Sequence, residues 1–175
     1  PPLPLFALLS SMNTMNKSVI FLEAGKAALR ENRPYLEQCQ AIRRDVFINE
    51  QGVDEKIDLD GNDEICAHLL LLLDDEAVGT ARIRKTERGT KLERIAVLAS
   101  HRGQGLGEIL VRSALSLLDE GPYIHAQMTS LGFYTHLGFV QEKAEIYYEA
   151  NIPHTTMILP PTAAVGEAPC PIIRR

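Results

Sequence analysis

HRGQGLGEIL, the stretch from His101 to Leu110, places three glycines directly before an apolar run. Its three glycines stand at every second position, and apolar residues recur after them at helical spacing. A helix N-terminus offers unpaired N–H groups and the positive end of a dipole, and glycines before it let the backbone approach an anion closely. The stretch therefore predicts a phosphate-binding loop. The alternative at this point is a plain glycine turn before a core helix.

The spacing narrows the choice of phosphate ligand. Glycines at 103, 105 and 107 do not follow the GxGxxG pattern of dinucleotide-binding units. Glu108 follows the last glycine where a nucleoside triphosphate loop would have lysine and then serine or threonine. Arg102 can add a charged contact to phosphate oxygens.

The segments on either side of this loop alternate between strand and helix patterns. We expect a helix that begins near Asn32, with Pro34 in its first turn, and a helix after the glycine loop that ends at Gly121 and Pro122. We expect strands over residues 17–22, 66–73, 77–85, 91–98, 123–128 and 154–159, and a short helix over 129–137. In the strand over 91–98, strict alternation places Leu92, Arg94 and Ala96 on one face and Glu93, Ile95 and Val97 on the other. The pattern predicts an α/β (α+β) fold with a mixed, mostly antiparallel sheet flanked by helices.

The length of 175 residues fits one domain. We expect residues 17–160 to form it. The proline-rich residues 1–16 are interpreted as a non-native or disordered N-terminal extension. Residues 161–175, also proline-rich and without periodicity, are interpreted as a flexible C-terminal tail.

Composition excludes several classes of partner. The formal net charge is −5 and the basic residues form no long run, which argues against nucleic-acid binding. No apolar run reaches the roughly 18 residues of a membrane span. The three cysteines form no CxxC pair, so free thiols and a reducing cytoplasm are expected. The acidic loop from Asp54 to Glu64 lacks EF-hand spacing, so we expect it to be solvated and predict no metal.

The segment IAVLASHRGQGLGEILV resembles the acetyl-CoA-binding motif of the GNAT acetyltransferase superfamily, whose pattern is [QR]-x-x-G-x-[GA]. Arg102, Gly105 and Gly107 fit that pattern, after a strand and before a helix. QMTSLGFYTHLGF resembles a later motif of the superfamily. The opening IRRDVFINEQGVDEKIDLDGNDEICAH and the ending NIPHTTM are similar to the ElaA/YjcF-like branch. The resemblance covers roughly residues 17–160 and implies the GNAT fold.

The resemblance also implies how acetyl-CoA binds as co-substrate. The loop amides would hold the CoA pyrophosphate, and the preceding strand would pair with the pantetheine arm. Gln127 stands where many members have asparagine and would contact the same arm. The implied donor-binding residues are Ile95, Ala96, Val97, Arg102, Gly103, Gln104, Gly105, Leu106, Gly107 and Gln127.

Acetyl transfer to an amine requires a neutral nitrogen, a donor to the oxyanion and a proton for the leaving thiolate. Tyr134 matches the family's tyrosine beside the CoA sulfur and is the expected acid, with core packing as the alternative. Glu93 lies on a strand where some members carry a base, although a salt-bridged carboxylate is equally compatible with the sequence. His154 is a second candidate for the base, because histidine titrates near neutral pH. Glu50 and Gln51 are expected at the acceptor, or in a network at a helix end.

The resulting hypothesis is an N-acetyltransferase that acts by direct attack of a primary amine, from a small molecule or a peptide, in a ternary complex. Two alternatives stay open. One is a CoA-binding regulatory module without turnover. The other is transfer from a different acyl donor, as in autoinducer synthases, which share a similar RxxVF segment near Arg43 to Phe47. Dimers are common in the superfamily, so a homodimer is compatible with the resemblance.

Overall fold

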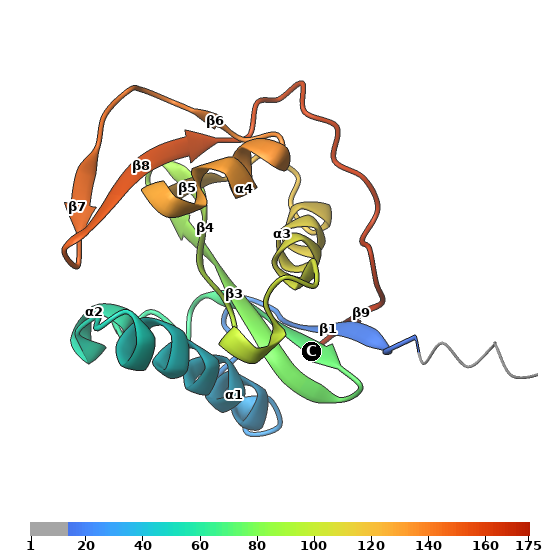
Figure 1. Cartoon of the computed structure of the whole chain (residues 1–175). Helices are drawn as coiled ribbons and strands as arrows, with labels where there is room; N and C mark the ends of the chain where they lie inside the picture. Colours follow the sequence, from blue (N-terminus) through green and yellow to red (C-terminus); the bar gives the residue numbers. More distant parts are fainter. Residues whose placement is uncertain (1–13) are drawn as a thin grey trace, which may run out of the picture.

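A single nine-stranded sheet organises the protein (Figure 1). The structure is a computed structural model and describes residues 14–175. The predicted extension over 1–16 therefore lies almost entirely outside the described residues. The strand order is β6-β8-β5-β4-β3-β2-β1-β9, and β7 pairs with β8. All neighbours are antiparallel except β4–β5 and β1–β9. This arrangement confirms the predicted mixed, mostly antiparallel sheet.

The elements follow the predicted order with shifted boundaries. The strands are β1 Lys17–Leu22, β2 Ala67–Leu73, β3 Glu76–Thr86, β4 Gly89–Val97, β5 Tyr123–Gln127, β6 Val140–Gln141, β7 Tyr147–Glu149, β8 Ile152–Ile158 and β9 Ile172–Arg174. The helices are α1 Arg33–Arg43, α2 Glu55–Asp58, α3 Leu106–Ser116 and α4 Leu131–His136; η1 Arg44–Glu50 is a π-helix, and η2 Ala99–His101 and η3 Met128–Ser130 are short 3₁₀ turns.

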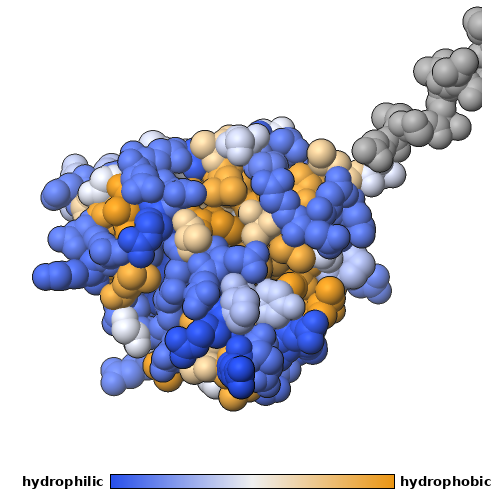
Figure 2. Space-filling model, turned by 90° about the horizontal axis from the view of Figure 1, so that it is seen from below, coloured by the Kyte–Doolittle hydropathy of each residue, from blue (hydrophilic) through white to orange (hydrophobic). Residues whose placement is uncertain are grey.

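Each face of the sheet has its own apolar core. Helices α1 and α2 lie on one side and α3 and α4 on the other (Figure 1). On the α1 side, Ile20 and Leu70 pack against α1 residues such as Cys39 and Ile42. On the α3 side the larger cluster joins strand residues such as Leu69 to Leu110 and other residues of α3. Seen from below, the surface is mostly hydrophilic, with hydrophobic patches between the polar residues (Figure 2).

A bulge in β4 corrects the alternation expected for this strand. Thr80 pairs with Ala96 and Arg82 with Glu93, so β4 has one more residue than β3 over this interval. The backbone of Arg94 adopts φ +54°. The extra residue changes which side chains share a face, because strict alternation fails across a bulge. Glu93 therefore faces the same side as Arg82, and not the side of Ile95 and Val97 as predicted.

The ends of two other segments also differ from the predictions. Helix α3 ends at Ser116, several residues before Gly121 and Pro122, so this pair does not cap it. The predicted flexible tail over 161–175 is wrong at its far end. Ile172–Arg174 form β9, which extends the sheet in parallel with β1 through backbone hydrogen bonds such as Val19 N–H to Pro171 O at 2.9 Å. Within residues 14–175, no helix combines the length and the apolarity that crossing a bilayer requires.

Candidate active site

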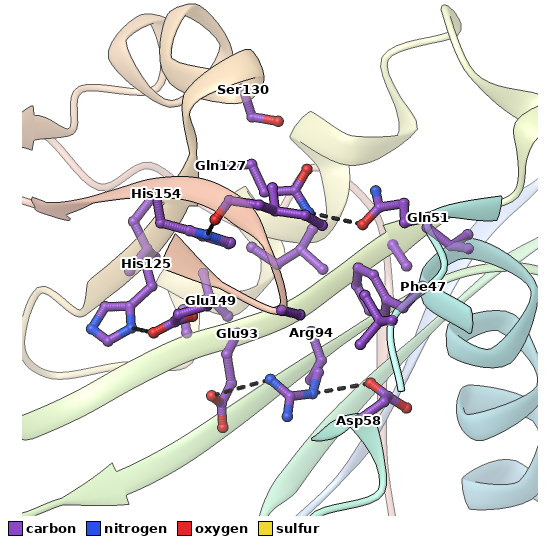
Figure 3. Close-up of a pocket in the computed structure, with 18 of the residues that line it drawn as sticks. Phe47, Gln51, Asp58, Glu93, Arg94, His125, Gln127, Ser130, Glu149 and His154 are labelled. Carbon is purple, nitrogen blue, oxygen red and sulfur yellow. Dashed lines mark hydrogen bonds and ion pairs between the residues drawn. The ribbon is translucent and has the colours of Figure 1, made fainter. Parts of the chain in front are cut away.

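A pocket opens where β4 and β5 separate. The two strands are parallel neighbours, but their register holds a single pair of residues, Lys91 and Tyr123. Beyond that pair the strands diverge and leave a cavity of about 270 Å³. Its walls come from β4, β5 and β8 and from the chain around η1 and α2 (Figure 3). A cavity inside a sheet exposes backbone N–H and C=O groups of the strand edges, which an extended ligand can pair with.

Five of the ten predicted donor-binding residues are in the lining of this pocket. Ile95, Ala96, Val97, Arg102 and Gln127 line it. Residues Gly103 to Gly107 follow Arg102 but are not part of the lining.

The glycine loop has the backbone conformation that the sequence suggests. Gly103 and Gly105 have φ of +76° and +75°, a region in which glycine carries no steric penalty. Gly105 is the N-cap of α3. A Cβ on Gly107 would lie 3.3 Å from Phe133 Cζ, so the loop packs directly against α4. Leu106 is buried in the core, which leaves only its backbone for a ligand.

Arg102 is held on two sides. Its guanidinium forms a bidentate pair with Glu50, at 2.5 and 2.8 Å, and its Nε donates to Val97 O at 3.0 Å. The hydrogen bond to Glu50 raises the pKa of Arg102, and the same bond lowers the pKa of Glu50. Glu50 does not line the pocket. The structure therefore places the predicted acceptor residue Glu50 against the predicted phosphate contact.

A second polar contact joins two residues of the pocket lining. Gln127 Nε2, at the end of β5, donates to Gln51 Oε1 at 2.9 Å, and the two side chains point toward each other (Figure 3). Gln51 is the residue after η1. Adjacent residues at the end of η1 thus contact the donor loop and β5.

Glu93 lies in a buried network of ion pairs. It is 8% exposed, and Arg82 Nη2 and Arg84 Nε donate to its Oε1 at 2.8 and 2.7 Å. Burial alone would raise the pKa of Glu93, but the hydrogen bond from Arg84 and the charges of Arg82, Lys91 and Arg94 outweigh it and lower the pKa to about 2. A carboxylate held as a stable anion is a weak base. The geometry favours the salt-bridged alternative over catalysis.

The same network includes part of the acidic loop, which is therefore only partly solvated: Asp58 and Asp63 are buried, whereas Asp54, Glu55 and Glu64 are exposed as expected. Arg82, fully buried, also binds Asp60 at 2.7 Å and Asp63 at 2.9 Å. Arg43 is buried as well and binds Asp58 and Asp63. Because buried charges are costly without partners, the loop folds inward to compensate the two arginines. Among residues 14–175, no group of three or more histidine, cysteine or acidic side chains is arranged to hold a metal ion.

Tyr134 lines the pocket from α4. Its ring packs edge-on against Phe133 and Phe139, with centroid distances of 5.0 and 5.8 Å. Burial raises its pKa above the usual value. A phenol with a raised pKa stays protonated, so its hydroxyl is available as a hydrogen-bond donor in the pocket.

His154, in β8, lines the same pocket and is 8% exposed. Its Nδ1 lies 2.7 Å from Ile152 O. A carbonyl can only accept, so Nδ1 carries the hydrogen, and in the neutral ring Nε2 is then the free acceptor. The ring stacks on Tyr147.

Among the pocket residues that the sequence did not predict for the site, Lys91, His125 and Glu149 contact one another or a common partner. Glu149 ends β7, at a turn in which Ala150 and Asn151 have positive φ. His125 Nδ1 lies 2.7 Å from Glu149 Oε1 and 3.2 Å from Lys91 Nζ. The available signal was an asparagine turn between two runs of strand-forming residues, which predicts a hairpin. Of the two strands of this hairpin, β7 and β8, only β8 is predicted from the sequence.

Comparisons with known proteins agree with this architecture. The family model described as "Acetyltransferase (GNAT) domain" matches residues 35–160. The uncharacterised protein YyaT of Bacillus subtilis (strain 168) is 37% identical over 129 residues, covering 70% of this chain and 86% of its own. The crystal structure of Escherichia coli ElaA superposes with a TM-score of 0.66 at 27% identity, covering 82% of this chain and 98% of that one. The CoA-dependent acyl-homoserine lactone synthase BjaI, solved with SAM and isopentyl-CoA, has the same fold, with a TM-score of 0.66 at 18% identity and coverage of 91% and 94%.

Proposed function

Because this chain belongs to the GNAT acetyltransferase family, and is thus an acyltransferase, we propose that it transfers an acetyl group from acetyl-CoA to a primary amine in a ternary complex. The observation that carries the proposal is the opening between β4 and β5, which is lined by Tyr134 and by Arg102, the residue directly before the glycine loop. The deciding experiment is a thiol-release assay with acetyl-CoA and a panel of amines. Release of CoA that depends on the amine supports transfer.

The donor would bind along β4 and end at the glycine loop. The pyrophosphate would take backbone N–H groups of residues 103–107 at the start of α3, where the helix dipole favours an anion. The pantetheine arm would pair with the backbone of Ile95 to Val97, whose edge has no partner strand in β5 at that point. Gln127 would contact the same arm from the other side of the opening.

The chemistry would use two side chains that line the pocket, His154 of β8 and Tyr134 of α4. The neutral amine attacks the thioester carbonyl directly, and the strand amide near Val97 polarises the carbonyl oxygen. His154 takes the proton from the amine at Nε2, and Tyr134 donates its proton to the departing CoA thiolate. In this proposal His154, and not Glu93, is the base, because the Glu93 carboxylate is bound by Arg82 and Arg84.

Replacing Gly105 by valine tests the donor loop. A β-branched residue at φ +75° is strained, so the loop has to change shape. We expect the affinity for acetyl-CoA, measured by calorimetry, to fall at least about tenfold. Gly25→Val is the matched control, because Gly25 has φ +78° and open space around it but lies in a turn before α1. Equal affinities for Gly105→Val and the wild type would exclude the loop as the donor site.

Replacing Glu50 by glutamine tests the role of Arg102. The change removes the carboxylate that competes with a phosphate for the guanidinium, so we expect acetyl-CoA to bind about threefold more tightly. Glu55→Gln is the control, since Glu55 forms a comparable exposed pair with Arg44 on the neighbouring helix α2. Unchanged or weaker donor binding in Glu50→Gln would show that Arg102 does not need to leave Glu50 to bind the donor.

A different acyl donor is the second candidate, favoured by the structural likeness to BjaI, which was solved with isopentyl-CoA. The same thiol-release assay distinguishes the two when acetyl-CoA is compared with branched and longer acyl-CoA thioesters. A higher kcat/KM for a thioester with a longer acyl chain would indicate that this acyl group, and not acetyl, is the one transferred. Tight CoA binding without release for any thioester or amine would instead favour a binding module.

A further inference from the structure

The charges along the pocket differ in how they are compensated. Two carboxylates in the lining, Asp58 and Glu93, are bound by arginines. Asp58 Oδ1 lies 3.0 Å from Arg94 Nε, and Asp58 also pairs with buried Arg43. In Figure 3, Arg94 lies between Glu93 and Asp58. Neither carboxylate is available to a ligand without breaking the network.

Glu149, the third carboxylate in the lining, has no arginine partner. Its ion-pair partner is the His125 ring, and among the described residues no lysine or arginine forms a salt bridge with it. Its side chain is 45% exposed and lies at the pocket. The hydrogen bond from His125 lowers the pKa of Glu149, so the group is ionised. Lys91, the nearest pocket lysine, lies 3.4 Å from Glu93 and is shared with that carboxylate.

The two arginines of the pocket already bind carboxylates of the protein. Arg94 faces Asp58 and Asp60, and Arg102 faces Glu50 in a bidentate pair. An acceptor with its own carboxylate, such as an α-amino acid, would need a free guanidinium or ammonium group to bind it. Its carboxylate would instead lie near the ionised carboxylate of Glu149, whose ion-pair partner is His125, and the two like charges would repel.

The wall across from β8 contains a group of apolar side chains beside the polar Gln51 and Asp58. The apolar residues are Val46 and Phe47 of η1, Val53 after it, and Ile57 of α2. Methylene groups gain free energy by burial against such side chains. The combination of these apolar side chains and one available carboxylate suits an aliphatic chain with a positive charge.

From this juxtaposition we propose that the acceptor is a diamine or polyamine without a carboxylate, and that Glu149 binds one ammonium group while the other, neutral amine is acetylated. The inference rests on the proposed function and names its substrate class. The attacking nitrogen forms the amide bond, the carbon–sulfur bond breaks, and the thiolate receives the proton. His125 acts as a positioning residue, because its ring holds the Glu149 carboxylate at the pocket.

The test compares acceptors that differ in one group. Cadaverine and lysine differ by a carboxylate, and cadaverine and pentylamine differ by the second amine. With acetyl-CoA saturating, we expect kcat/KM to be at least about tenfold higher for cadaverine than for either of the others, since a charge-assisted hydrogen bond contributes about that factor. The difference should lie in KM.

Two variants make the assignment specific to Glu149. Glu149→Gln should raise KM for cadaverine about tenfold, with kcat and acetyl-CoA affinity nearly unchanged, and should leave pentylamine unaffected. Glu142→Gln is the matched control, because Glu142 is a nearby carboxylate that pairs with Arg88 and does not line the pocket. It should behave as the wild type for all three amines.

The outcomes separate the two proposals. Lysine turned over as well as cadaverine, or an unchanged KM for cadaverine in Glu149→Gln, overturns the acceptor class while acetyl transfer stands. A protein that binds acetyl-CoA but releases no thiol with any amine contradicts the proposed function, and the acceptor class with it.

Discussion

Tyr134→Phe is expected to lower kcat about 100-fold, because a positioned general acid contributes roughly that factor or more. The phenylalanine keeps the ring that packs between Phe133 and Phe139, so the fold and the donor site should be unchanged. Only the proton for the departing thiolate is lost. The measurement is thiol release at saturating acetyl-CoA and amine, together with calorimetry for donor affinity.

The control for this variant is Tyr148→Phe. Tyr148 is 72% exposed in β7 and does not line the pocket, so its hydroxyl should not affect kcat. A kcat for Tyr134→Phe within twofold of the wild type would exclude Tyr134 as the acid. A parallel loss of donor affinity would instead assign the hydroxyl to binding.

Arg82→Met is expected to lower the free energy of unfolding by about 3–5 kcal/mol, the usual cost of removing one partner from a buried ion pair. Arg82 is fully buried and binds Asp60, Asp63 and Glu93, so its loss leaves three carboxylates short of a cation. Denaturant titration measures the change. Arg44→Met is the control, because the Arg44–Glu55 pair is exposed and should contribute less than about 1 kcal/mol. Equal shifts for the two variants would contradict a stabilising network.

The same network predicts how stability depends on pH. The folded protein lowers the pKa of both Glu93 and Asp63 to about 2, although burial alone would raise each. A lowered folded-state pKa stabilises the protein above the unfolded value, about 4, and this contribution is lost as the pH falls toward 2. The wild type should therefore lose stability steeply between these values.

How far the sequence predicts this protein depends on the range of the interactions involved. The hairpin between β2 and β3 was predictable because its turn residues, Asp74 and Asp75, are adjacent in sequence and both tolerate positive φ. The glycine loop was predictable for the same reason. Strand β9 was not, because Ile172–Arg174 pair with β1 across almost the whole length of the chain, and no local pattern marks a parallel partner.

The site was predictable in part. The donor side follows from one short motif and its neighbouring strand, and the structure brings Ile95, Val97, Arg102 and Gln127 to one pocket. The burial of Asp58 and Asp63 in the acidic loop depends on Arg43 and Arg82, which come from different elements and meet the loop only after folding. Glu149 lies in a strand of three residues, too short for a periodic pattern to reveal.

The bulge at Arg94 interrupts the alternation of side chains along β4. Before it, the odd-numbered Glu93 faces the same side as Arg82; after it, the odd-numbered Ile95 and Val97 face the α3 side. A substitution at position 94 changes one side chain and leaves this assignment of residues to the two faces unchanged. Deleting the residue would restore regular pairing, with Glu93 still opposite Arg82 and Ala96 still opposite Thr80, so both segments would keep their present faces. The bulge is therefore an insertion that the strand accommodates. It adds Arg94, which binds Asp58 and Asp60, without moving the residues on either side of it to the wrong face.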